Sequence, residues 1–147
     1  MIVIEASSTV DKVDADIVAL PFFEDERPLR GASGLVDWRM NGALSRLILQ
    51  GAVSGLEGES FLMSTDGRIS APRLLLFGLG NSNIFDAKRF QTLLSQFVKT
   101  VARLKFTRLA IAIPGSSLFS MKNVGDVVKK EFEKAGMPDD TEVIIIG

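Results

Sequence analysis

Residues 73–103 constrain the fold more than any other segment, because they read in succession as a buried strand, a glycine turn and an amphipathic helix. Leu74–Phe77 is an unbroken apolar run, typical of a strand covered on both faces. Gly78 and Gly80 permit a sharp exit from this strand, and Asp86 is a suitable helix N-cap. The predicted helix has one apolar stripe at three- and four-residue intervals, made by Phe90, Leu93, Leu94, Phe97, Val98, Val101 and Leu104.

Further strands are predicted wherever short apolar or alternating segments end in turn residues, namely at Ile2–Glu5, Ile17–Phe23, Glu59–Ser64, Leu109–Ile113 and Val143–Ile146. Asp66-Gly67 is a hairpin signal, so Arg68–Phe77 is expected to return beside Glu59–Ser64 as its antiparallel partner. Leu35–Gln50 predicts two short helices or a kinked one, because Asn41-Gly42 interrupts the pattern.

The order of these segments predicts the fold class. A last helix is expected over Val124–Ala135, with Gly136 and Pro138 as its stop signals. Strands alternate with helices in the second half, while a hairpin lies in the middle. We therefore expect one α/β domain over residues 1–147, with a mixed, mostly parallel sheet of about six strands and helices on both faces. Crossover connections are expected to be right-handed.

Composition excludes several classes of protein. The 147 residues include neither Cys nor His, so disulfides, thiolate chemistry and histidine catalysis are absent. The net charge of −1 argues against nucleic-acid binding driven by bulk charge, and a local basic face stays open. No apolar run is long enough to span a membrane, and the N-terminus lacks the basic start of a signal peptide. We expect a cytoplasmic protein.

Two loops are candidate ligand sites, because each follows a buried strand and precedes a helix. The first consists of Gly78, Gly80, Asn81, Ser82 and Asn83, and the second of Gly115, Ser116 and Ser117. Neither carries a dinucleotide fingerprint or a Walker lysine. A tight structural turn is the favoured interpretation of the first loop. If the loops lie side by side at the carboxyl edge of the sheet, they could hold an anion or a nucleotide together.

Other polar groups are assigned simpler roles. Glu24-Asp25-Glu26 is expected to be a solvated loop, because no pocket is suggested nearby. Ser64–Arg68 faintly resembles a metal-binding signature but is interpreted as the hairpin turn. Trp38 is expected in the core or as an interface anchor rather than stacked on bases. The basic residues of the central helix are expected on its solvated face, with a weak polyanion or partner contact as the alternative: Lys88, Arg89, Lys99 and Arg103. No catalytic residues, metal ligands or cofactors are predicted.

The spacing of small residues from about Asp16 onward resembles the N-terminal domain of the cytosol (leucyl) aminopeptidase family. The residues that carry this resemblance are Gly31-Ala32, Leu35, Asp37, Gly42, Leu44-Ser45, Gly51, Gly55, Gly58-Glu59 and Leu75-Leu76-Phe77-Gly78-Leu79-Gly80. Val53 and Leu56 depart from it, since the family often has an aromatic residue and a lysine there.

The resemblance implies a three-layer, macro-domain-like fold that lacks the metallopeptidase chemistry, which in the family belongs to a separate C-terminal domain. It implies a non-enzymatic role in oligomerisation, regulation or partner binding, with a second copy or an aminopeptidase catalytic segment as the partner. Some bacterial members use this domain in DNA binding. The alternative is a module that binds ADP-ribose or a similar nucleotide through Gly78–Asn83 and Gly115–Ser117. No asparagine-rich motif follows the second strand, which makes ADP-ribose hydrolysis doubtful.

Overall fold

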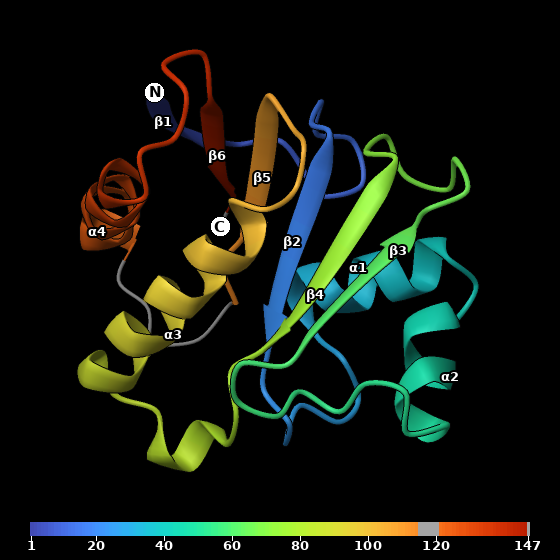
Figure 1. Ribbon diagram of the computed structural model, residues 1–147. Helices are drawn as coiled ribbons and strands as arrows, with labels where there is room; N and C mark the ends of the chain where they lie inside the picture. The colour runs from blue at the N-terminus through green and yellow to red at the C-terminus, as the bar shows by residue number, and fades with distance from the viewer. Residues whose placement is uncertain (115–120, 147) are drawn as a thin grey trace.

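The computed structural model describes residues 1–114 and 121–146, and of residues 121–123 only the backbone (Figure 1). Its six strands form one sheet in the order β1-β6-β5-β2-β4-β3. The strands are β1 (Ile2–Ala6), β2 (Ile17–Phe22), β3 (Ser60–Ser64), β4 (Arg73–Gly78), β5 (Arg108–Ala112) and β6 (Glu142–Ile146). The helices are α1 (Gly31–Arg39), α2 (Ala43–Leu49), α3 (Ala87–Val101) and α4 (Met121–Lys134), with a short 3₁₀ helix, η1 (Ser82–Ile84).

The sheet is mixed and mostly parallel, as the sequence predicts. Only the β3–β4 pair is antiparallel, with Ser60 opposite Phe77 and Ser64 opposite Arg73. All other neighbouring strands are parallel. The carboxyl ends of β2, β4 and β5 therefore meet at one edge of the sheet, and the loops that leave these three strands start side by side.

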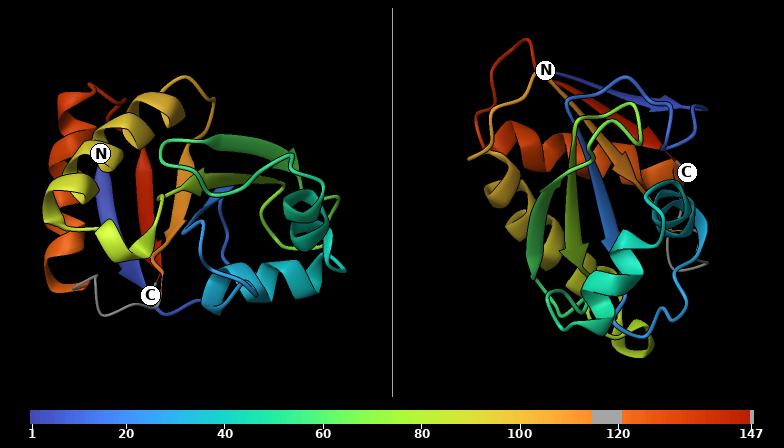
Figure 2. Two further views of the ribbon diagram at one scale, coloured as in Figure 1. Left: turned by 90° about the horizontal axis from the view of Figure 1, so that it is seen from below. Right: turned by 90° about the vertical axis from the view of Figure 1, so that its right-hand side faces the viewer.

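Two apolar layers cover the sheet, one on each face. Figures 1 and 2 show α3 and α4 on one side of the strands and α1 and α2 on the other. Alternate residues of β2 serve the two layers, because successive side chains of a strand point to opposite faces. Ile17 and Ala19 belong to the cluster under α3 and α4, whereas Val18 and Leu20 belong to the cluster under α1 and α2. This arrangement explains why the central strands have no polar face.

The helices begin and end close to the predicted residues. Asp86 caps α3 by accepting a hydrogen bond from the backbone N–H of Arg89 at 2.8 Å. The buried residues of α3 are members of the predicted stripe: Leu93, Leu94, Phe97, Val98 and Val101. The 35–50 segment forms two short helices that break at Asn41-Gly42, as expected. The first of them begins four residues earlier than its apolar pattern suggests.

The hairpin is shorter than predicted. The turn forms at Asp66-Gly67, where both residues have positive φ and the Arg68 N–H donates to the carbonyl of Thr65 at 2.9 Å. The partner strand, however, starts at Arg73 rather than Arg68. Residues 68–72 form a loop instead, because Thr65 holds this segment through its side chain: its hydroxyl donates to the carbonyl of Ala71 at 2.6 Å. The turn interpretation of Ser64–Arg68 is thus confirmed.

Trp38 is not in the core. It lies on α1 and is 68% exposed, which rules out the core-packing alternative.

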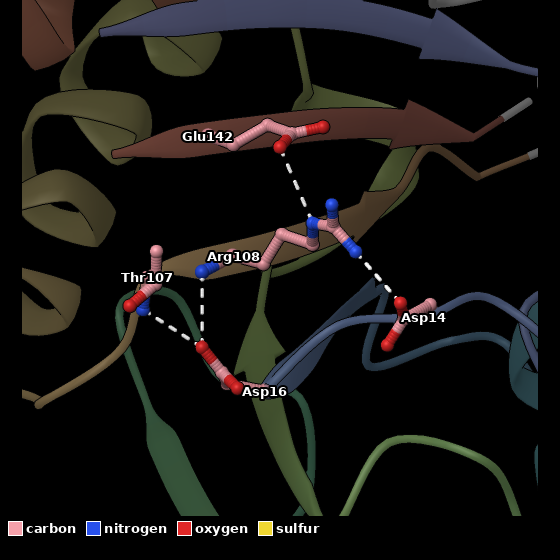
Figure 3. A network of polar contacts seen from close by, with 5 residues as sticks. All are labelled: Asp14, Asp16, Thr107, Arg108 and Glu142. Atoms are coloured by element: carbon pink, nitrogen blue, oxygen red, sulfur yellow. Dashed lines mark hydrogen bonds and ion pairs between the residues drawn. The ribbon is translucent and has the colours of Figure 1, made fainter. Parts of the chain in front are cut away.

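A network of charged groups joins the amino ends of β2, β5 and β6 (Figure 3). One carboxylate oxygen of Asp16 accepts the backbone N–H groups of Thr107 at 2.7 Å and Arg108 at 3.0 Å. The Arg108 guanidinium donates in turn to Asp14 at 2.7 Å and Glu142 at 3.2 Å. The hydrogen bonds from Arg108 and Thr107 lower the pKa of Asp16 below its ordinary value. The charged side chains at the amino edge of the sheet are thus paired with one another.

Candidate functional site

The two candidate loops leave the sheet at the opposite, carboxyl edge. Gly78 ends β4, and Gly80, Asn81, Ser82 and Asn83 follow it. The loop after β5 is described as far as Pro114, so Gly115, Ser116 and Ser117 lie outside the described residues.

The backbone donors of the first loop are largely engaged within the protein. The N–H groups of Gly78, Leu79 and Gly80 donate to the carbonyls of Glu59, Phe22 and Gly55, over 2.8 to 2.9 Å. The Asn83 N–H donates to the side chain of Asn81 at 2.8 Å. A phosphate-cradling loop needs free N–H groups that point toward the ligand. These contacts agree with the favoured interpretation of a tight turn.

Ser82 links this loop to the acidic loop, which we define as residues 24–28. Its backbone N–H donates to the Asp25 carboxylate at 2.9 Å, and its hydroxyl donates to the second oxygen of the same carboxylate. The hydroxyl and backbone hydrogen bonds from Ser82 lower the pKa of Asp25 below its ordinary value. Asp25 is thus ionised at neutral pH and fixed in place.

A cavity of about 350 Å³ lies beside this link. Its lining comes from the ends of β2 and β5, the acidic loop, the start of α1 and η1: Pro21, Phe23, Asp25, Glu26, Arg30, Gly31, Ala32, Ser33, Ser82, Ala112 and Pro114. We refer to it as the α1 cavity. The acidic loop is largely exposed, as predicted, but the expectation that no pocket lies nearby is wrong, because Asp25 and Glu26 border this cavity.

The first turn of α1 contributes unpaired donors to the α1 cavity. Arg30, at the N-cap position, makes no side-chain cap. Among the described residues, the backbone N–H groups of Gly31, Ala32 and Ser33 have no hydrogen-bond partner. The Ser33 side chain is 6% exposed, and its hydroxyl also has no partner within the described part of the chain. Because Ser33 lines the cavity, water or a ligand there could accept hydrogen bonds from these groups.

Glu26 brings a carboxylate to the same place. It is partly buried, and its Oε2 accepts the backbone N–H of Arg30 at 3.2 Å. Burial raises the pKa of Glu26, and the hydrogen bonds from Arg30 and Phe23 only partly offset that effect. The cavity thus combines two carboxylates with the positive end of a helix and one guanidinium.

Sequence reasoning found Ser82 but missed Glu26, Arg30 and Ser33. The available signal was the serine in the first turn of a helix whose N-cap position lacks a capping side chain. That signal depends on where α1 begins, and the apolar pattern placed the start at Leu35.

Neither a metal cluster nor a membrane-spanning helix was found within residues 1–114 and 121–146. No group of three or more Asp and Glu side chains there could hold a metal ion. None of the helices in this part of the chain combines the length and the apolar character that crossing a membrane requires.

Sequence comparisons identify relatives over most of the chain. Residues 19–128 match the N-terminal domain of the cytosol aminopeptidase family. A probable cytosol aminopeptidase of Sulfurihydrogenibium sp. is 28% identical over 120 residues, which are 82% of this chain and 23% of the relative. A probable cytosol aminopeptidase of Thermosynechococcus vestitus is 30% identical over 105 residues, 70% of this chain and 21% of the relative. The chain thus spans about a fifth of the length of these relatives.

Solved structures share the fold at low identity. A mutant of tomato leucine aminopeptidase superposes with a TM-score of 0.76 at 18% identity, covering 100% of this chain and 32% of that one. The macrodomain of Mycobacterium tuberculosis DarG has a TM-score of 0.75 at 12% identity, covering 99% and 97%. A Trypanosoma brucei macrodomain in complex with ADP has a TM-score of 0.73 at 10% identity, covering 98% and 63%.

The expected macro-domain-like fold is confirmed by these structures. Because the family match covers most of the residues, the chain belongs to the cytosol aminopeptidase family through that family's N-terminal domain.

Proposed function

We propose that this chain is a non-catalytic interaction domain that assembles with a second copy of itself or with an aminopeptidase catalytic segment. Its relatives are cytosol aminopeptidases that continue well beyond the matched region. A cytoplasmic location, shared with those relatives, is part of the proposal.

The exposed Trp38 on α1 is the observation that carries this proposal. The Arg39 guanidinium carbon lies 4.8 Å from the centroid of the Trp38 ring. Arg39 is itself held by Asp11, since its Nε donates to Asp11 Oδ2 at 3.0 Å and the Asp11 side chain is only 6% exposed. An exposed tryptophan supported in this way presents a large apolar surface with little rotamer entropy to lose. Trp and Arg are the residues most enriched among binding hot spots.

Light scattering after size-exclusion chromatography tests the proposal, with the chain alone and with a full-length cytosol aminopeptidase. We expect an associated species in one of the two arms. Trp38→Ala should weaken that association by about tenfold or more. Ile84→Ala is the matched control, because Ile84 is also a large exposed apolar residue but lies on η1. A strict monomer in both arms, or equal behaviour of the two variants, would contradict the proposal.

A nucleotide-binding module is the second candidate function. It is supported by the α1 cavity and by the likeness to a macrodomain solved with ADP. In this proposal Gly78–Asn83 and residues 115–117 flank the ligand. We rank it second because Asp25 and Glu26 in the lining repel a polyphosphate. Calorimetric titration with ADP-ribose and ADP decides the question, and flat titrations at millimolar ligand would remove this candidate.

A further inference from the structure

The α1 cavity places groups of opposite charge next to each other. Its positive side consists of the N–H groups of residues 31–33, which have no partner in the described part of the chain, and the Arg30 guanidinium. Its negative side consists of Glu26 and Asp25. The two sides are within a few ångströms, because Glu26 Oε2 lies 3.2 Å from the Arg30 backbone nitrogen that directly precedes α1. A ligand that satisfies both sides must carry its own opposite charges close together.

Ser33 adds a hydroxyl to the positive side. Its side chain is more than nine-tenths buried and borders the cavity. Its hydroxyl has no partner among the described residues. A polar group without a protein partner is normally satisfied by water or by a ligand, so the Ser33 hydroxyl is available to a ligand in the cavity. A carboxylate at the start of α1 would accept from this hydroxyl and from the N–H groups beside it.

The charges select against a polyphosphate. Two carboxylates face the cavity and one guanidinium offsets them, so several negative charges on a ligand would meet net repulsion. A zwitterion with one carboxylate and one ammonium matches the two sides instead. An α-amino acid fits the spacing, because a single carbon joins its two charged groups.

The size and the remaining lining agree with this class of ligand. A cavity of about 350 Å³ is near the lower end of ligand pockets, which span roughly 300–1,000 Å³. Four residues supply apolar surface for an aliphatic side chain: Pro21, Phe23, Ala112 and Pro114.

We infer that the α1 cavity binds a free α-amino acid with an aliphatic side chain, whose carboxylate lies on the first turn of α1 and Ser33 and whose ammonium lies on Glu26. This inference does not depend on the interaction role proposed above. It differs from the nucleotide candidate in the ligand class that it assigns to the cavity.

Titration of the isotopically labelled 147-residue chain with L-leucine, followed by amide NMR, tests the inference. We expect saturable shifts centred on residues 26 and 30–33. Leucinamide, which lacks the carboxylate, and 4-methylpentanoate, which lacks the ammonium, should each bind about tenfold more weakly or worse. No saturable shifts with leucine, or equal affinity for leucine and both analogues, would overturn it. Tighter binding of ADP-ribose than of leucine would also overturn it, in favour of the nucleotide candidate.

Two variants test separately the contact assigned to the carboxylate of the ligand and the contact assigned to its ammonium group. Ser33→Ala should weaken leucine binding about tenfold, with Ser95→Ala on α3 as the control. Glu26→Gln should weaken leucine to a similar degree and leave 4-methylpentanoate unaffected, with the exposed Glu133→Gln as the control. Circular dichroism of each variant checks that it folds. Stronger leucine binding by Glu26→Gln would contradict the assigned orientation. Light scattering measures association independently of leucine binding, so a failure of this inference can be distinguished from a failure of the proposed interaction role.

Discussion

The two hydrogen bonds accepted by Asp16 are expected to contribute measurably to stability, and Asp16→Ala tests their contribution. The Asp16 carboxylate fastens the backbone before β5 to the start of β2 (Figure 3). A hydrogen bond to a charged group contributes about 1.5–3 kcal/mol, so two would give about 3 kcal/mol at the lower bound. Water can replace part of this, because Thr107 is exposed and Arg108 is partly exposed. We therefore expect a loss of about 2 kcal/mol, which lowers Tm by roughly 4–8 °C.

Asp14→Ala is the matched control within the same network. Asp14 also pairs with Arg108, at 2.7 Å, but its side chain is 94% exposed. Exposed ion pairs contribute about 0–1 kcal/mol, so this variant should be close to wild type. Urea unfolding followed by far-UV circular dichroism measures both variants. If Asp14→Ala destabilises the protein as much as Asp16→Ala, the assignment of the stability to the backbone hydrogen bonds is wrong.

The dependence on pH provides a second check on Asp16. Its pKa in the folded protein is lowered below the ordinary value of 3.8, chiefly by the backbone hydrogen bonds from Arg108 and Thr107. The contribution of the charge is therefore present above pH 3.8 and is lost as the pH falls through the folded pKa. Asp16→Asn should differ from wild type at neutral pH, and the difference should shrink as the pH falls below 3.8 and through the lowered pKa of Asp16 in the folded protein. A difference that persists unchanged at the acidic end would refute this account.

Two further predictions concern packing. Gly78→Ala should destabilise the protein by about 3 kcal/mol or more, because a Cβ there would overlap the carbonyl oxygen of Leu56. Gly67→Ala should cost only about 1 kcal/mol, because a Cβ there meets no neighbour and only the positive φ is strained. Urea unfolding of both variants measures the two free energies. Leu93→Ala should cost about 2–5 kcal/mol, because Leu93 on α3 is buried against the sheet. Leu62→Ala, on the exposed side of β3, should cost less than about 1 kcal/mol, and equal thermal shifts for the two variants would contradict the described burial.

Local rules predicted the parts of the fold that depend on nearest neighbours. The apolar run at Leu74–Phe77 is a buried strand, and Asp86 caps α3, because each property is determined by a few adjacent residues. The resemblance to an aminopeptidase domain also rested on local spacing of small residues, and the family match confirms it. The antiparallel pair, β3 with β4, also followed from a local signal, the Asp66-Gly67 turn, whereas the order of the strands in the sheet was not predicted.

The α1 cavity could not be predicted in this way, because contacts distant in sequence create it. Asp25 meets Ser82, which is 57 positions away. Glu26 is partly buried and accepts the backbone N–H of Arg30, and nothing in the sequence of the acidic loop distinguishes it from a solvated loop. The loop of residues 68–72, between the hairpin turn and β4, was missed for a similar reason, because the hydrogen bond from the Thr65 side chain to Ala71 holds it.

The central sheet divides the interior into two apolar compartments, and this division determines how amino-acid substitutions combine. Val18 and Leu20 contact one compartment, and Ile17 and Ala19 contact the other, so the two sets of side chains do not share partners. Substitutions in separate compartments should therefore have independent effects on unfolding free energy. A substitution on the side that contains α1 and α2 should therefore leave the packing against α3 and α4 largely unchanged.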